Sequence, residues 1–297
     1  MEKILVLMAT YNGEKYLQEQ LDSIYRQKGM NVDILVRDDG SKDGTVSILK
    51  DNQEKHSLQW YQGEHRNVQM GFFELMQKAV NMDYNYFAFC DQDDVWDDDK
   101  LLIGYKSICD SSGCALYYSG QRLVDEKLNF IENHELNRGR SLKSRFVLSD
   151  FAGCTGVFNR KLLEETIKFK PKYMLMHDTW VLRICLCLGG KVVVDSEPHM
   201  NYRQHVGNTV GLKHGILATF KQVKQYIYEY QIEKLTKELL RGYGDRMIPE
   251  YKEVANWICS YRIDKKSRKK LLDKRNINFY NKGLNLTYRL KVIMGRL

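Results

Sequence analysis

The stretch Tyr86-Phe-Ala-Phe-Cys90 followed by Asp91-Gln-Asp-Asp-Val-Trp96 places an apolar run directly before a group of carboxylates. The run has the length and composition of a buried strand. Two ionised carboxylates about 4 Å apart repel by roughly 4 kcal/mol at an effective dielectric near 20, so the group favours a bound cation. Oxygen ligands suit Mg²⁺ or Mn²⁺ rather than zinc, and such ions complete their shells with phosphate oxygens, so a nucleoside diphosphate is the expected ligand. The alternative is an acidic loop that begins a helix at Asp97.

The sequence before this stretch alternates between strand and helix patterns. Strands are expected at residues 4–9, 33–36 and 58–61, helices at 45–55 and 71–81, and a further helix after a cap at Asn12. Alternation of this kind predicts an α/β fold with a mostly parallel sheet and flanking helices. In such folds, ligands gather at the carboxyl ends of the strands.

Polar loops follow the first two expected strands. They are Thr10-Tyr-Asn-Gly13 and residues 38–45, which read Asp-Asp-Gly-Ser-Lys-Asp-Gly-Thr. A turn that caps a helix would explain the glycines and the serine of the second loop, but not the adjacent Asp38 and Asp39. The first strand is not followed by GxGxxG, and the sequence has no GxxxxGK[ST], so neither a dinucleotide site nor a P-loop is indicated.

Composition indicates a globular protein of a reducing compartment. The 297 residues are 43% hydrophobic, and the seven cysteines form no paired CxxC framework, which suits the cytosol. No apolar run approaches the roughly 18 residues of a membrane span. A single lysine precedes the first apolar run without a cleavage site of small residues, so a first strand is expected there rather than an export signal.

The ordered motifs resemble those of the family 2 glycosyltransferases, which have the GT-A fold. The resemblance covers roughly residues 3–215 and rests on the two polar loops, Asn67 with Gly71, and Asp91-Gln-Asp93. The form Asp91-Gln-Asp-Asp-Val-Trp96, with His177-Asp178 and Tyr202-Arg-Gln-His205, is most similar to rhamnosyltransferases of bacterial surface polysaccharide assembly. The chain is therefore expected to divide into a catalytic domain at 1–214 and a helical, basic extension at 215–297.

The resemblance implies roles for particular residues. Nucleotide-sugar contacts are implied for Thr10, Tyr11, Asn12, Asp39, Asn67 and Asp91, with the base against Tyr11. Asp93 would hold the metal, and Asp178 would be the general base, the alternative for Asp178 being a helix N-cap. The acceptor side would involve Gly153, Cys154, Thr155, His177 and Trp180, although a plain turn at 153–156 and a core role for Trp180 are alternatives.

Two further side chains have chemistry that suits a diphosphate site. The planar guanidinium of Arg203 can bind phosphate oxygens, and His205 can complete a metal shell. Both precede a glycine-bearing stretch at 206–211, which is expected to be a loop. The alternative for His205 is a solvated histidine.

These roles imply an inverting, metal-dependent glycosyltransferase that uses Mg²⁺ or Mn²⁺. The expected donor is dTDP-L-rhamnose and the expected acceptor a lipid-linked polysaccharide precursor at the inner face of the bacterial membrane. One alternative is another donor such as a UDP-hexose. Another is a sugar-phosphate nucleotidylyltransferase. The last is a binding module without catalysis, and the retained carboxylates disfavour this module.

The C-terminal tail carries the excess of positive charge. Residues 262–297 contain twelve lysines and arginines against two aspartates, a net charge of +10, whereas the whole chain is +8. Helical spacing joins Phe220, Val223 and Ile227, then Leu235 and Leu239, and finally Leu286, Leu290, Ile293 and Leu297. The last of these faces and the basic cluster at 265–270 predict a helix that lies on an anionic membrane surface. Electrostatic attraction between the charges of the cluster and the membrane would contribute at most roughly 5 kcal/mol to binding. A solvated basic helix, packing on the core and a homodimer contact are alternatives, and no nucleic-acid motif accompanies the charge.

Overall fold

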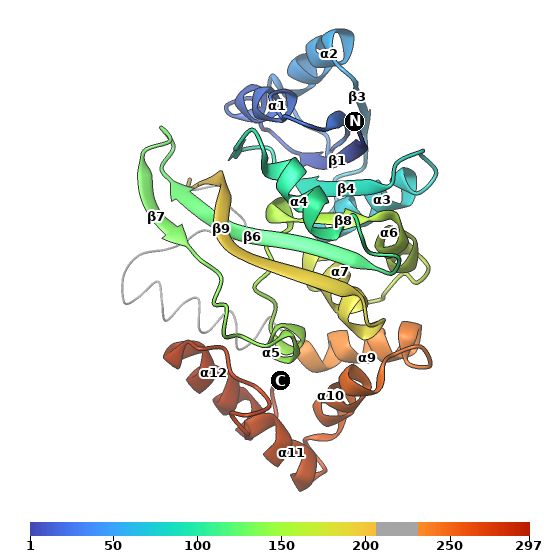
Figure 1. Cartoon of the computed structure of the whole chain (residues 1–297), viewed down its shortest axis with the longest axis vertical. Helices are drawn as coiled ribbons and strands as arrows, with labels where there is room; N and C mark the ends of the chain where they lie inside the picture. The colour runs from blue at the N-terminus through green and yellow to red at the C-terminus, as the bar shows by residue number, and fades with distance from the viewer. Residues whose placement is uncertain (206–230) are drawn as a thin grey trace.

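The computed structural model describes residues 1–205 and 231–297 (Figure 1). The expected loop at 206–211, the spacing of Phe220, Val223 and Ile227, and the expected domain boundary after residue 214 lie outside the described residues.

The described strands form a single nine-stranded sheet in the order β3-β2-β1-β4-β8-β6-β9-β5, with β7 paired to β6. The strands are β1 Lys3–Thr10, β2 Asn31–Asp38, β3 Leu58–Gln62, β4 Tyr86–Cys90, β5 Val95–Trp96, β6 Ala115–Val124, β7 Phe130–His134, β8 Val157–Asn159 and β9 Lys191–Arg203. Strands β1 to β4 run parallel to one another, and β6 runs parallel to β9. Strand β8 is antiparallel to both β4 and β6, so β4 and β6 point the same way. The carboxyl ends of β1 to β4, β6 and β9 therefore share one edge of the sheet.

Helices cover both faces of the sheet (Figure 1). They are α1 Leu17–Tyr25, α2 Thr45–Lys55, α3 Val68–Ala79, α4 Lys100–Ile108, α5 Leu142–Val147, α6 Arg160–Ile167, α7 His177–Cys187, α9 Ile232–Tyr243, α10 Pro249–Ser260, α11 Lys265–Leu272 and α12 Lys282–Ile293. Alternation along β1 divides the core, because Leu5 and Leu7 join the cluster under α3, α6 and α7, whereas Val6 and Met8 join the cluster under α1, α2 and α4. The α/β fold class is confirmed.

The C-terminal helices belong to the same core as α3, α6 and α7. Tyr261, Leu271 and Tyr288 are buried in the cluster that includes α3 and α7. The Tyr243 hydroxyl donates to the carbonyl of Glu165 at 2.7 Å, which joins α9 to α6. No helix among the residues that the structure describes has the length and apolarity needed to cross a bilayer.

Two local expectations are wrong. Asn12 does not cap a helix: its backbone is left-handed at φ +48°, its side-chain oxygen accepts from the Lys42 amide, and α1 begins only at Leu17. Leu297 does not continue the exposed face of α12, because it is buried and its amide donates to the Tyr261 hydroxyl at 2.8 Å.

Candidate active site

The loops after β1 and β2 are joined by a buried carboxylate. Asp38 accepts from the amides of Gly40 and Ser41 at 3.0 and 2.9 Å and from the Thr10 hydroxyl at 3.2 Å. The Ser41 hydroxyl in turn accepts from the Asn12 amide at 2.9 Å. Asp38 therefore shapes the loop.

Asp39 has a different partner. Its carboxylate forms an ion pair with the fully buried Arg37, whose guanidinium also reaches Glu74 at 3.2 Å. A Cβ on Gly71 would lie 3.4 Å from that guanidinium, so the glycine leaves room for the pair. Asn67 caps α3 by accepting from the Met70 amide at 3.1 Å. The nucleotide contacts predicted for Asp39 and Asn67 stay predictions.

Tyr11 projects from the carboxyl end of β1 with 44% of its surface exposed. Its ring lies 4.7 Å from the ring of His65. Gln92 holds this loop against the acidic loop, because its side chain accepts from the Tyr11 amide at 2.9 Å and donates to the Tyr11 carbonyl at 3.1 Å. The role of Gln92 was not apparent from the sequence, since an amide between aspartates has no motif of its own.

The acidic loop after β4 is short of positive partners. Burial, followed by the charge of Asp93, raises the pKa of both Asp91 and Asp94. One oxygen of Asp94 accepts from the Arg203 amide at 3.0 Å, whereas the other is buried with no hydrogen-bond partner within residues 1–205 and 231–297. A buried carboxylate oxygen without a hydrogen-bond partner lowers the stability of the fold unless a cation or a proton binds to it.

Two sets of side chains near this loop could hold a cation. Asp91, Asp94 and Cys154 have ligand atoms within 4.8 Å of one another. Burial raises the pKa of the Cys154 thiol well above its usual range, so it stays protonated and is a poor ligand for a hard ion. The second set is Asp93 and His205, whose atoms Oδ2 and Nε2 contact each other directly at 2.8 Å, and their role as metal ligands stays a prediction. Oxygen ligands with one imidazole fit Mn²⁺ or Mg²⁺.

Lys100 is a buried cation below the acidic loop that sequence reasoning missed. It is 1% exposed, its ammonium lies 3.6 Å from the centre of the Trp96 ring, and it has no hydrogen-bond partner among the described residues. Burial lowers its pKa to about 8. The attraction to Asp94 raises the pKa of Lys100 and so opposes the effect of burial. The positive charge of Lys100 therefore offsets part of the negative charge of the acidic loop.

Arg203 occupies a different position from the one expected of a phosphate ligand. It is 2% exposed, and its guanidinium donates to the Asp93 carbonyl at 2.8 Å, the Glu126 carbonyl at 2.6 Å and the Glu19 carboxylate at 2.5 Å. It thereby ties the end of β9 to the acidic loop and to α1. A direct phosphate contact would require it to exchange these bonds, so its position corrects the expectation.

Asp178 and the acidic loop meet across one short turn. The 3₁₀ turn η1 Gly153–Thr155 donates the Gly153 amide to Asp178 Oδ2 at 3.0 Å, and its Cys154 lies beside Asp91. Asp178 is not the N-cap of α7, a position that Met176 occupies without a side-chain bond. Burial raises the pKa of Asp178 to about 6, although hydrogen bonds from Thr179 and Gly153 oppose the shift.

All five residues expected on the acceptor side are buried. Trp180 is fully buried beside Phe169 and Tyr243, so it cannot stack on a sugar, and the core alternative is correct. His177 stacks on Phe72 at 3.9 Å, and burial lowers its pKa to about 3, which keeps it neutral. The Thr155 hydroxyl is bonded to the Ala152 carbonyl. Gly153 leaves room for the His177 ring, because a Cβ there would lie 2.7 Å from His177 Nε2, and its contact with the acceptor stays a prediction.

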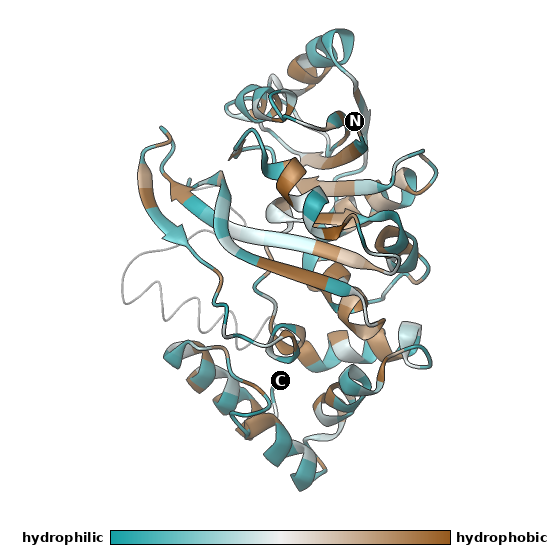
Figure 2. Cartoon of the chain, in the orientation of Figure 1, coloured by the Kyte–Doolittle hydropathy of each residue, from teal (hydrophilic) through white to brown (hydrophobic). Residues whose placement is uncertain are grey.

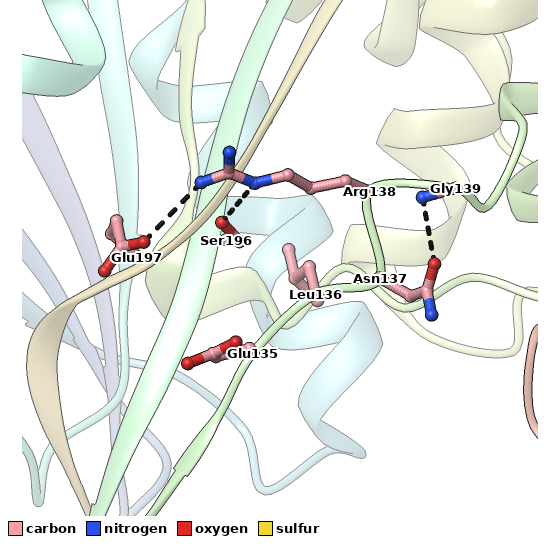
Figure 3. A pocket seen from close by; sticks show the side chains of 7 residues that line it. All are labelled: Glu135, Leu136, Asn137, Arg138, Gly139, Ser196 and Glu197. Atoms are coloured by element: carbon pink, nitrogen blue, oxygen red, sulfur yellow. Dashed lines mark hydrogen bonds and ion pairs between the residues drawn. The ribbon is translucent and has the colours of Figure 1, made fainter.

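A separate open cavity of about 450 Å³ lies between the segment after β7 and strand β9 (Figure 3). Arg138 reaches across it to the Ser196 hydroxyl at 2.7 Å and to Glu197 at 3.5 Å. None of the residues predicted for the donor, metal or base lines this cavity.

Comparisons with known proteins agree with this architecture. The family model for glycosyl transferase family 2 matches residues 5–167. A curated relative, the dTDP-rhamnosyl transferase RfbG of Shigella flexneri, is 28% identical over 256 residues, covering 78% of this chain and 84% of the relative. An uncharacterized glycosyltransferase of Rickettsia typhi is 25% identical to this chain, and the match covers 79% of this chain and 73% of the length of the relative.

Solved structures share the fold at low identity. S. aureus TarS 1-349 in complex with UDP-GlcNAc has a TM-score of 0.59 and 15% identity over 99% of this chain and 91% of its own. The Pyrobaculum calidifontis mannosyltransferase PcManGT, in complex with GDP-Man and Mn²⁺, has a TM-score of 0.57 and 17% identity over 99% and 86%. These likenesses show the GT-A fold.

Proposed function

The chain belongs to glycosyl transferase family 2, and from this premise we propose that it transfers a sugar from a nucleotide donor to a glycan hydroxyl with inversion. One observation carries the proposal: Asp178 lies across the Gly153–Thr155 turn from Asp91. A base on one side of the turn and a diphosphate-binding loop on the other is the arrangement that single displacement requires.

The donor side is proposed to bind a pyrimidine nucleoside between the first two loops. The exposed Tyr11 ring offers a face for the base, and His65 borders it. Asp39 would accept from the ribose or the base, and Arg37 holds it in place. Gln92 fixes the distance between this subsite and the acidic loop, so the nucleoside and its diphosphate are positioned together.

The leaving group departs with negative charge, and the acidic loop alone would repel it. We assign Asp93 as the principal protein ligand of a divalent cation, with His205 beside it. When bound, Mg²⁺ or Mn²⁺ would neutralise the charge that builds on the diphosphate. Arg203 holds the loop that carries Asp93, because its bonds go to the Asp93 carbonyl and the Asp94 side chain.

Asp178 is proposed to take the proton from the acceptor hydroxyl. Its carboxylate is oriented by the Gly153 amide, and its raised pKa makes it a better base than an ordinary carboxylate. Gly153 has no Cβ, which leaves room for the His177 ring beside the turn. His177 packs behind this turn as a neutral aromatic, so it supports the turn without charge.

The proposed donor is dTDP-L-rhamnose, with a UDP-hexose as the alternative. Support comes from the relative named a dTDP-rhamnosyl transferase, which is matched over most of its length. The acceptor is proposed to be a lipid-linked polysaccharide precursor, which would bring the protein to the inner face of the cell membrane.

Turnover of a donor panel tests this proposal. The full chain would be incubated with dTDP-rhamnose, UDP-glucose, UDP-GlcNAc and GDP-mannose, with Mg²⁺ or Mn²⁺ and extracted bacterial glycolipids. We expect dTDP release that depends on the lipid extract, measured by coupled nucleotide assay, and transfer of labelled sugar to lipid. Release from a UDP-sugar alone would establish the alternative donor, and no transfer from any donor would contradict the proposal.

The pH dependence follows from Asp178. Because burial raises its pKa to about 6, the carboxyl is largely protonated below that pH and cannot accept a proton. We therefore expect kcat at saturating donor to rise as pH increases through about 6 and then to level off. Turnover of matched samples from pH 5 to 8 measures this limb. A flat profile over this range would argue against Asp178 as the base.

A further inference from the structure

Exposed apolar side chains concentrate at one end of the molecule. On α12, Leu286 is 62% exposed and Ile293 is 59% exposed, and Leu290 and Met294 are exposed beside them. They lie on one stripe of the helix, because positions 286, 290 and 293 are separated by four and three residues. The opposite side of α12 is buried through Tyr288 and Val292. A soluble helix normally keeps such an apolar stripe against a core.

A neighbouring turn extends this stripe. Ile263, between α10 and α11, is 91% exposed. A Cβ on Gly295, just past α12, would lie 4.0 Å from the side chain of the adjacent Arg262, so this turn borders the end of α12. We call Ile263, Leu286, Leu290, Ile293 and Met294 the apolar ridge.

Basic residues outnumber acidic ones in the sequence around the ridge, because residues 262–297 contain twelve lysines and arginines and only two acids, Asp264 and Asp273. Residues 274–297 contain six lysines and arginines and no Asp or Glu. Lys282 and Arg289 lie on α12 one turn from Leu286, and Lys265, Lys266 and Lys269 are exposed on α11. Figure 2 shows hydrophobic and hydrophilic bands alternating along α12.

We infer that the apolar ridge docks on an anionic lipid bilayer, with the apolar side chains among the acyl boundary and the lysines and arginines at the headgroups. The combination of apolar and basic groups distinguishes this partner from two others. A second copy of the chain would bring an equal positive charge to the same face, which opposes association. A nucleic acid would use the charge but leave the apolar side chains in water.

The ridge is part of the folded protein and not a detachable tail. Tyr261, Leu271 and Tyr288 are buried in the main core, and the Leu297 carbonyl accepts from the Glu233 amide at 3.3 Å. Deleting residues 262–297 would therefore remove core side chains as well as the ridge. Point substitutions of exposed residues separate docking from folding.

The test uses the double variant L286S/I293S in the full chain, with sedimentation on vesicles of phosphatidylglycerol and phosphatidylcholine. We expect wild type to bind anionic vesicles, to bind purely zwitterionic ones weakly and to release as salt rises. The double variant should lose affinity by at least roughly tenfold, since the ridge would bury apolar area at the membrane. The triple variant K282E/R289E/K269E should lose the preference for anionic vesicles.

The matched control is F130S/I131S, which removes two exposed apolar side chains from β7 instead. We expect its vesicle binding and melting temperature to equal those of wild type. Equal loss in the control, or unchanged binding by L286S/I293S, would overturn the proposal. A wild-type dimer in sedimentation velocity that L286S/I293S dissociates, without vesicle binding, would identify a second copy as the partner instead.

This inference does not rest on the proposed donor or reaction. Vesicle binding is measured without nucleotide or acceptor, so a failed donor assay leaves it standing. Conversely, loss of docking with normal nucleotide release would leave the proposed catalysis intact.

Discussion

Replacing Asp178 with asparagine should lower kcat by about 10²-fold or more while the donor dissociation constant changes little, as expected when a general base is lost. Asparagine keeps one oxygen, which can accept from the Gly153 amide as the carboxylate does at 3.0 Å. The other carboxylate oxygen accepts from the Thr179 amide, and this is the bond that asparagine gives up. The turn beside the acidic loop keeps its own bond and should therefore keep its conformation. Single-turnover rates and donor titration by calorimetry would separate the two parameters.

Stability provides an internal check on this variant. The folded-state pKa of Asp178 is raised, so this group stabilises the fold most at low pH and loses that contribution as pH rises through about 6. At pH 8 the wild type carries a buried charge that asparagine lacks. The variant should then melt at the same temperature as wild type or higher. The buried carboxylate would thus lower the stability of the wild type while serving its activity.

A partly buried aspartate without a proposed chemical role serves as the control. Asp150 accepts from the Tyr118 hydroxyl at 2.9 Å and pairs with Arg145 at 3.0 Å. Asp150→Asn should lower the melting temperature but leave kcat per folded molecule unchanged. Near-normal turnover of Asp178→Asn would show that Asp178 holds the turn and that the base lies elsewhere.

The sheet was predictable because its central strands are continuous apolar runs. Residues 4–9 and 86–90 lie within β1 and β4, where both faces are covered and nearly every side chain is buried. Strands β5 and β8 have two and three residues, too short to leave a pattern. They complete the sheet through tertiary pairing, which local sequence does not encode.

Site residues were predictable where a loop follows a strand, and less so where packing decides. The Asp93 and His205 pair was expected from chemistry, and the fold brings the two side chains together. Burial decided the outcome for Trp180, because a tryptophan at a helix start suits both a core and a sugar platform. Lys100 escaped notice because a lysine beside aspartates normally indicates a solvated helix end.

The substitution Asp93→Ala should abolish metal-supported donor binding and lower turnover by at least about 10²-fold, because the proposed link between protein, cation and diphosphate is lost. The loop should survive the change. Arg203 bonds the carbonyl of Asp93, which the substitution leaves in place, and Asp94 still accepts from the Arg203 amide. The defect would therefore be chemical and not a collapse of the loop.

Asp94→Ala is the informative contrast to Asp93→Ala. It removes the buried carboxylate that accepts from the Arg203 amide, so it should lower the melting temperature, whereas Asp93→Ala should not. Manganese binding, followed by electron paramagnetic resonance with and without dTDP, should weaken strongly in Asp93→Ala and only moderately in His205→Ala, because oxygen ligands dominate such sites. The decisive comparison is wild type in excess chelator. Full turnover there would show that Asp93 serves the reaction without a cation. The carboxylates of the acidic loop would then need another source of positive charge, and the buried Lys100, which is attracted to Asp94, is one candidate.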